Sequence, residues 1–229
     1  MYAEGPSGNI VAEMFNFLTG TGLWIAFIVC VGGLMARFLF LLVVSRRRDR
    51  ILYNHVDFVW GVKSIVHWMI PGASVSMRLQ PFFTFVGFGF HITLLAVPLF
   101  LQAHNVLFQH AFGISLPSIS NDLADVFIVV FFLCWLVLLF RRIWRPEVRI
   151  LTGPWEYALL LFTLLPFVTG FLAFHQIGSY QAMMFMHVLS AELLLILIPA
   201  TRLSHCVLFF ITRAFIGFEL GARRGARSW

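Results

Sequence analysis

The chain has 229 residues, of which 60% are hydrophobic and 11% charged, and its formal net charge is +6. A soluble domain carries about 25% charged residues, so the composition excludes an ordinary soluble protein, and no basic face of the kind that binds nucleic acid is available. We expect one integral membrane domain over residues 1–229, all α-helical, because the apolar runs are too long for barrel strands.

Five apolar segments reach or approach the ~20 residues that a membrane-spanning helix needs. They cover about residues 22–45, 81–104, 122–142, 155–175 and 182–212. Local signals mark three of the starts: Pro81 is a favoured first-turn residue, Ser120 is a good N-cap type, and Gly153-Pro154 precedes the fourth segment. The sequence therefore predicts a five-helix membrane bundle.

Residues 51–72, between the first two segments, differ from the five apolar runs. They mix apolar residues with His55, Asp57, Lys63 and His67, and they end at Pro71-Gly72. Such a mixture is typical of an amphipathic helix that lies on the membrane surface. We expect this helix on the cytoplasmic side, where a partner could dock.

The distribution of basic residues predicts the orientation of the bundle. All sixteen Lys and Arg residues lie after the first, third and fifth segments or at their ends, and the loops near 105–121 and 176–181 contain none. Because cytoplasmic loops carry the excess of Lys and Arg, the N-terminus is expected outside and the C-terminus in the cytoplasm.

Four of the eight histidines lie in or at the ends of the apolar segments. They are His91 and His104 on the second segment and His187 and His205 on the fifth. Ionisable groups inside a membrane are rare and usually functional, although a single histidine can also be structural, hydrogen-bonded across helices. We expect the remaining four to face water or an interface: His55, His67, His110 and His175.

The spacing of the four histidines points to metal ligation. His187 and His205 are 18 residues apart, roughly five turns and ~27 Å of one continuous helix, close to the ~30 Å of a bilayer core. Since the second and fifth segments run antiparallel, His91 shares a depth with His205, and His104 with His187. A haem iron takes two axial ligands, so two haem b sites are predicted, one near each membrane surface.

The outer pair is less regular than the inner pair. His91 and His104 are 13 residues apart, roughly 3.6 turns, and so do not share one face of a straight helix. Pro98 lies between them and can bend or unwind that stretch. His110 is the alternative outer ligand, although it lies further into the polar loop.

Two arginines near the inner edge have two interpretations. Arg202 lies three residues before His205, and Arg37 lies at similar depth on the first segment. A guanidinium group matches a carboxylate fork, so either could bind a haem propionate. Either could equally anchor its helix at the membrane surface by extending its charged end to water.

The residues of the fifth segment also carry a family resemblance. The run from His187 to His205, which ends in Pro199-Ala-Thr-Arg-Leu-Ser-His205, resembles the final span of the respiratory nitrate reductase gamma subunit. Phe90-His91-Ile92 resembles the start of that family's second span, and Arg145-Pro-Glu-Val-Arg149 its loop into the fourth. The resemblance covers about residues 85–213.

This resemblance implies a five-helix dihaem cytochrome b with its N-terminus outside. It implies His91 and His205 as ligands of the inner haem and His187 as a ligand of the outer haem. The family's other outer ligand corresponds to Leu101 here, and His104 is the nearest substitute. This departure and the longer first loop make the chain similar to the cytochrome b subunits of transmembrane redox complexes in sulfate-reducing bacteria.

That similarity implies an electron-transfer subunit of an oxidoreductase complex in the bacterial cytoplasmic membrane, rather than a stand-alone enzyme. Electrons would pass through two haems b between an outer donor or acceptor, menaquinone or a periplasmic multihaem cytochrome c, and a cytoplasmic iron–sulfur protein. Other membrane subunits would accompany the chain. The alternatives are a monohaem, quinone-reactive anchor subunit and a cofactor-free transporter or anchor.

Overall fold

The computed structural model describes residues 6–225, and this part of the chain is mainly helical and has no strand, only one isolated bridge between Leu101 and Ile119. The prediction of an all-α, multi-pass membrane protein is confirmed. Within the described residues, six helical stretches are long and apolar enough to cross a membrane, where the sequence predicted five. They are Ala12–Arg48, Pro81–Phe100, Asn121–Trp144, Pro154–Phe174, Tyr180–Ala200 and Arg202–Arg223.

The chain folds as two compact units. The first contains the residues up to Ser76 together with those from Phe185 onward, and the second is Met77–Met184. Helix α11 (Tyr180–Ala200) begins in the second unit and continues into the first. The two units are described separately below.

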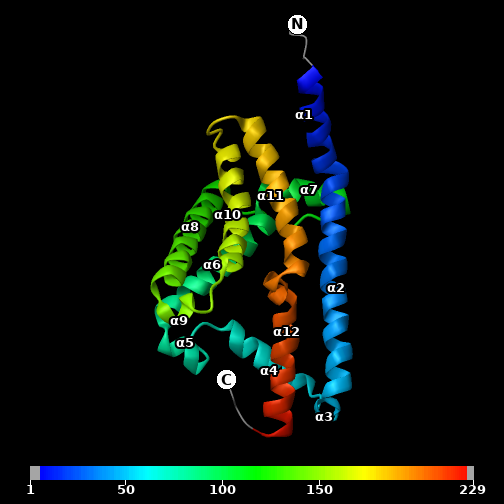
Figure 1. The fold of residues 1–229 in the computed structure, drawn as a ribbon, viewed down its shortest axis with the longest axis vertical. Coiled ribbons are helices and arrows are strands. Elements are labelled where there is room, and N and C mark those ends of the chain that lie inside the picture. Colours follow the sequence, from blue (N-terminus) through cyan, green and yellow to red (C-terminus); the bar gives the residue numbers. More distant parts are fainter. Residues whose placement is uncertain (1–5, 226–229) are drawn as a thin grey trace. The chain divides into compact units, whose positions relative to one another are not determined.

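A long N-terminal rod forms one side of the first unit. It consists of α1 (Pro6–Phe17), a π-helical turn η1 (Leu18–Gly22) and α2 (Leu23–Arg48), which follow one another without a break. The predicted first span, 22–45, begins at the last residue of η1 and otherwise lies within α2, and three arginines form the last turn of that helix. In the first unit α2 runs beside α11 and α12 (His205–Ile216) (Figure 1).

The predicted amphipathic segment, 51–72, forms two helices, the short α3 (Arg50–Tyr53) and α4 (Phe58–Met69), and its location on a membrane surface stays a prediction. Asp57 caps α4, because its side chain accepts a hydrogen bond of 3.0 Å from the backbone N–H of Trp60; this is the usual role of an aspartate at an N-cap. The helix packs against α12 and the π-helical η3 (Gly217–Arg223).

Glycines allow α4 to approach its neighbours closely. A methyl group on Gly217 would overlap the backbone carbonyl of Trp60, and a methyl group on Gly221 would overlap the indole ring of the same residue. On α12, the guanidinium group of Arg213 lies 3.7 Å from the centroid of a Trp68 ring, a cation–π contact. The face of α4 that holds Gly61 and Ser64 is therefore buried against α12 and η3, whereas Val59, Val62 and Val66 are exposed.

The predicted fifth span, 182–212, is wrong as one continuous helix. Helix α11 ends at Ala200, Thr201 is extended (φ −127°, ψ −167°), and a 3₁₀ turn η2 (Arg202–Ser204) precedes α12. Pro199 has no N–H for the helical ladder, and the Thr201 hydroxyl accepts a hydrogen bond of 3.2 Å from Leu203 N–H, starting a new helix. His187 and His205 therefore do not share one uninterrupted helix, and the five-turn spacing argument fails.

The second unit is built on α6 (Pro81–Phe100), α8 (Asn121–Trp144) and α10 (Pro154–Phe174), with the short α5 (Val75–Leu79) and α9 (Pro146–Arg149) at its loops. The local start signals are confirmed: Pro81 and Pro154 occupy the first turns of α6 and α10, and the Ser120 hydroxyl accepts from Leu123 N–H at 3.3 Å.

An aromatic stack forms the core of this unit. Phe131 of α8 is fully buried, and its ring lies between those of Phe90 on α6, at 5.2 Å, and Phe167 on α10, at 3.9 Å. Trp135 also links α8 to α10, because its indole N–H donates to the carbonyl of Leu160 at 2.9 Å. These contacts hold the three helices together and keep the centre of the unit dry.

The predicted second span, 81–104, is too long. Helix α6 ends at Phe100, Leu101 is extended (φ −65°, ψ 132°), and a separate helix α7 (Gln102–Phe112) follows. His104 belongs to α7. Pro98 lies two residues before the end of α6, and proline removes a backbone donor from the helical ladder. The interruption therefore lies in the stretch that Pro98 was expected to bend or unwind.

Candidate functional site

His91 lies on α6, in the second unit. Its imidazole is exposed at the helix surface and packs edge-on against Phe90, with ring centroids 5.3 Å apart. The Nδ1 atom lies 2.7 Å from the carbonyl oxygen of Gly87, one turn earlier. A carbonyl oxygen only accepts hydrogen bonds, so Nδ1 carries the proton and donates it.

His205 is the first residue of α12. It directly follows the interruption between α11 and α12, and these two helices with η2 between them are called the C-terminal rod. The His205 ring is also exposed, and its Nδ1 donates to the carbonyl oxygen of Arg202 at 2.9 Å. His104, on α7, is partly buried, and its Nδ1 donates to the carbonyl oxygen of Pro98 at 3.0 Å. All three imidazoles are therefore oriented by a backbone carbonyl group three to six residues earlier in the chain.

This shared arrangement fits metal ligation. When neutral histidine donates from Nδ1, its lone pair is on Nε2, and metal-bound histidines almost always donate their other ring nitrogen to a carbonyl or carboxylate. His91, His104 and His205 therefore have the tautomer and support that axial haem ligands use. His175 is the opposite case, because its Nε2 atom is the one hydrogen-bonded, to Asp125 at 3.1 Å.

His187, the fourth predicted ligand, lies on the part of α11 that belongs to the first unit and is half-buried. Its backbone carbonyl accepts a hydrogen bond of 3.0 Å from the hydroxyl of Ser190. His91 and His104 belong to the second unit and His187 and His205 to the first. Each predicted ligand pair takes one histidine from each unit, and the pairing stays a prediction.

Arg37 has a structural contact that the sequence did not indicate. Its guanidinium group donates to the carbonyls of Ala200 and Thr201, both at 3.2 Å, and to the Ser204 hydroxyl at 2.9 Å. The last carbonyls of a helix lack intrahelical donors and carry partial negative charge. Arg37 therefore caps the end of α11 and fixes the interruption that precedes His205.

A close backbone approach supports this cap. Gly33 lies one turn before Arg37 on α2, and a methyl group there would lie 2.6 Å from Cβ of Pro199. Only a glycine allows α2 to come this near. Arg202, the other predicted propionate ligand, is an exposed residue of η2, and its carbonyl accepts the hydrogen bond of His205.

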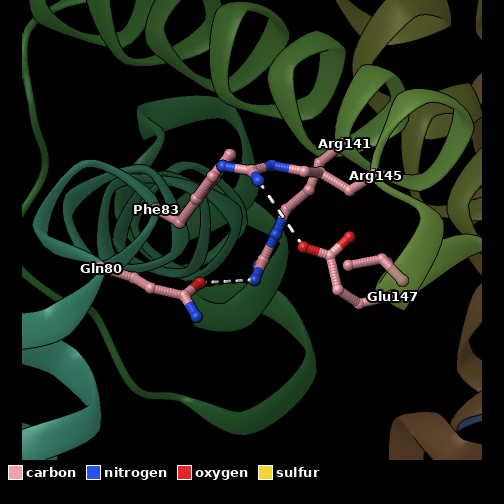
Figure 2. Close-up of a pocket in the computed structure, with 6 residues that line it drawn as sticks. Gln80, Phe83, Arg141, Arg145 and Glu147 are labelled. Atoms are coloured by element: carbon pink, nitrogen blue, oxygen red, sulfur yellow. Dashed lines mark hydrogen bonds and ion pairs between the residues drawn. The ribbon is translucent and has the colours of Figure 1, made fainter.

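A small pocket of about 200 Å³ lies in the second unit, near the end of α8 (Figure 2). Arg141 donates to the side-chain oxygen of Gln80 at 3.0 Å and lies over the ring of Phe83, 4.3 Å from its centroid. Arg145 pairs with Glu147 at 3.5 Å. None of the predicted haem ligands lines this pocket, and its arginines are already paired within it, so we assign it no cofactor.

Comparison with known proteins supplies one clear relative. A protein of the bacterium Nitratidesulfovibrio vulgaris, strain Hildenborough, described as "Protein", is 40% identical to the chain over 216 residues. The alignment covers 93% of this chain and 96% of the relative. The chain belongs to the family of that protein. No family model and no solved structure matches the chain.

Proposed function

We propose that the chain is a b-type cytochrome subunit that carries electrons across the bacterial cytoplasmic membrane through two haems b. The observation that carries the proposal is the common hydrogen bonding of His91, His104 and His205, each of which donates Nδ1 to a backbone carbonyl, so that a neutral ring would present Nε2 to a metal. Such a hydrogen bond fixes the tautomer and the ring orientation that an axial imidazole ligand needs. The apolar helices supply the membrane setting.

The ligand assignment follows the sequence argument. His91 and His205 would hold the inner haem, and His104 and His187 the outer haem, with Arg202 and Arg37 as candidates for the propionates of the inner haem. Haem iron, when bound, changes oxidation state by one electron and thereby supplies the redox chemistry. The protein would hold and insulate the cofactor rather than react with substrate.

The chain's own groups have specific tasks in this proposal. The carbonyl of Gly87 holds the His91 ring in one tautomer, and the carbonyl of Arg202 does the same for His205. Arg37 fixes the helix end from which the His205 segment starts. The stacked rings around Phe131 exclude water beside Phe90, the neighbour of His91.

The proposed topology counts α11 and the segment from η2 to η3 as one interrupted crossing, so that five crossings leave the N-terminus outside and the C-terminus in the cytoplasm. The rod from Ala12 to Arg48 has 37 residues, or about 55 Å at ~1.5 Å per residue, which exceeds the ~30 Å of the hydrocarbon core. Its arginine-rich end at Arg46–Arg48 would therefore project beyond the membrane. A cytoplasmic iron–sulfur protein would dock there, and menaquinone or a periplasmic multihaem cytochrome c would exchange electrons on the other side.

Haem counting on the purified protein tests the proposal. We expect two haems b per chain by pyridine haemochrome. A ratio of one would favour the monohaem, quinone-reactive anchor, and no Soret band would favour a cofactor-free transporter or anchor. Either result would overturn the dihaem proposal.

A matched pair of variants tests the ligand assignment. His91→Leu should remove one haem, because the substitution removes an imidazole that is proposed as an axial ligand. His175→Leu should retain both, because His175 uses Nε2 for its contact with Asp125. Loss of haem from the His175 variant but not from the His91 variant would show that the assignment is wrong.

A further inference from the structure

Glu192 is a carboxyl group buried in an apolar membrane helix. It lies on α11, in the part that belongs to the first unit, and is 6% exposed. Its Oε1 atom is buried and has no hydrogen-bond partner among the described residues. An acidic side chain in this setting requires a specific reason, because ionisable residues inside membranes are costly and mark sites of function.

The carboxyl group is packed against the π-helical turn η1. A methyl group on Gly22 would lie 3.2 Å from Oε1 and 3.3 Å from Oε2 of Glu192, whereas a methyl group on Gly20 would meet nothing within 4 Å. Gly22 thus leaves the space that the carboxyl group fills. Single π-helical turns within α-helices occur frequently at functional sites.

Among the described residues of the first unit, no charged group pairs with this carboxyl group. The rod that packs on it has no charged residue between Glu13 and Arg37 and only Cys30 as a titratable group. The guanidinium group of Arg37 is engaged by Ala200, Thr201 and Ser204 at the far end of α11. On α11 itself, His187 lies five residues before Glu192.

An ionised carboxylate without a partner is far too costly in such surroundings, and a carboxyl group avoids the cost by taking up a proton. The close fit against Gly22 leaves Oε1 no exposed surface at which a larger cation could bind. We propose that Glu192 is a proton-binding site inside the membrane, held as a neutral carboxylic acid, and that Gly22 makes the space for it.

Infrared spectroscopy of the purified protein at neutral pH tests the site directly. The wild-type spectrum should contain the C=O stretching band of a protonated carboxyl group that shifts in heavy water, and Glu192→Gln should remove it. Glu219→Gln is the matched control, since Glu219 accepts hydrogen bonds from Arg223 and Arg224 and is ionised; it should remove a carboxylate band instead. If Glu192→Gln removes no acid band, the proposal is overturned.

Carbodiimide labelling tests the same site in the unmodified chain, so it does not depend on a variant that folds. The oxygen of a protonated carboxyl group adds to the central carbon of dicyclohexylcarbodiimide while its proton moves to nitrogen, and the acyl group then migrates to nitrogen as a stable acylurea. Peptide mapping should find this adduct at Glu192, decreasing as the pH rises. Labelling of Glu192 that does not decrease as the pH rises would contradict the proposal.

The role of the proton rests on the proposed function. If an electron enters a haem in this protein, Glu192 provides a place for the compensating proton, and the haem midpoint potentials should fall as the pH rises. Glu192→Gln should reduce that slope, and Glu219→Gln should leave it unchanged. Absence of haem would overturn the cytochrome proposal alone, because the infrared and labelling tests of Glu192 need no haem.

Discussion

The contact between Gly33 and Pro199 gives the sharpest prediction for stability. In Gly33→Ala the new methyl group would lie 2.6 Å from Cβ and 2.9 Å from Cγ of Pro199. Carbon atoms are best separated by about 3.5–4.0 Å, so α2 must retreat by roughly 0.9 Å or more. The same retreat would stretch the bonds of 3.2 Å from Arg37 to the carbonyls of Ala200 and Thr201 beyond hydrogen-bonding range.

The expected loss is about 2–4 kcal/mol in the free energy of unfolding, from overpacking and weakened charge-assisted hydrogen bonds. Denaturation of the purified protein in mixed detergent micelles measures it. Gly32→Ala is the control, because its methyl group meets nothing within 4 Å. Both substitutions bring the same gain in helix propensity, up to ~1 kcal/mol, so the difference between them isolates the contact. Equal stabilities for the two variants would refute the reasoning.

Three further predictions concern the cap, a ligand and a loop. Arg37→Gln keeps some hydrogen bonding but loses the charge, and it should lower the free energy of unfolding by about 1.5–3 kcal/mol in the same denaturation assay. His205→Ala should lower the haem content of the purified protein, whereas His55→Ala should not change the pyridine haemochrome ratio. Asn105, which is 4% exposed and bonds to the backbone of Leu116 and the Ser118 hydroxyl, anchors the loop after α7. Asn105→Ala should cost about 2–3 kcal/mol and accelerate amide hydrogen exchange in residues 113–119; unchanged exchange would show that the loop is held by other contacts.

The sequence located the apolar helices and several of their starts because these depend on local chemistry. Proline at a first helical turn and serine at an N-cap act within three or four residues, and the structure places Pro81, Ser120 and Pro154 in those roles. Apolar composition over ~20 residues is equally local. Such signals can be interpreted without knowledge of the partners in space.

The interruption at Thr201 was missed because its stabilising group is distant in the sequence. The run from His187 to Ile211 is almost entirely apolar and predicts one helix, and Pro199 alone allows only a kink. The charge that stabilises the exposed carbonyls comes from Arg37, more than 160 positions earlier. A break of this kind needs a tertiary partner, which composition and periodicity do not identify.

The sequence marks Glu192 as a possible quinone contact, but its buried setting could not be predicted, for a related reason. Within its own segment it is one acidic residue among leucines, and nothing local indicates what covers its carboxyl group. The signal lies in Gly22, where a missing side chain creates the space. A glycine in an apolar segment has many possible causes, so its pairing with an acidic residue far along the chain becomes visible only in the folded structure.

The interruption of the C-terminal rod changes how the histidine spacing must be understood. Regular helical phase would have oriented His205 through its distance from His187, but the extended Thr201 separates the two and removes that link. What orients His205 instead is the carbonyl of Arg202, inside a turn whose entrance Arg37 holds in place. His91 is oriented by Gly87 in the same local way. The direction of each imidazole is therefore set by its own turn, and a displaced Arg37 should disturb His205 while leaving His91 unaffected.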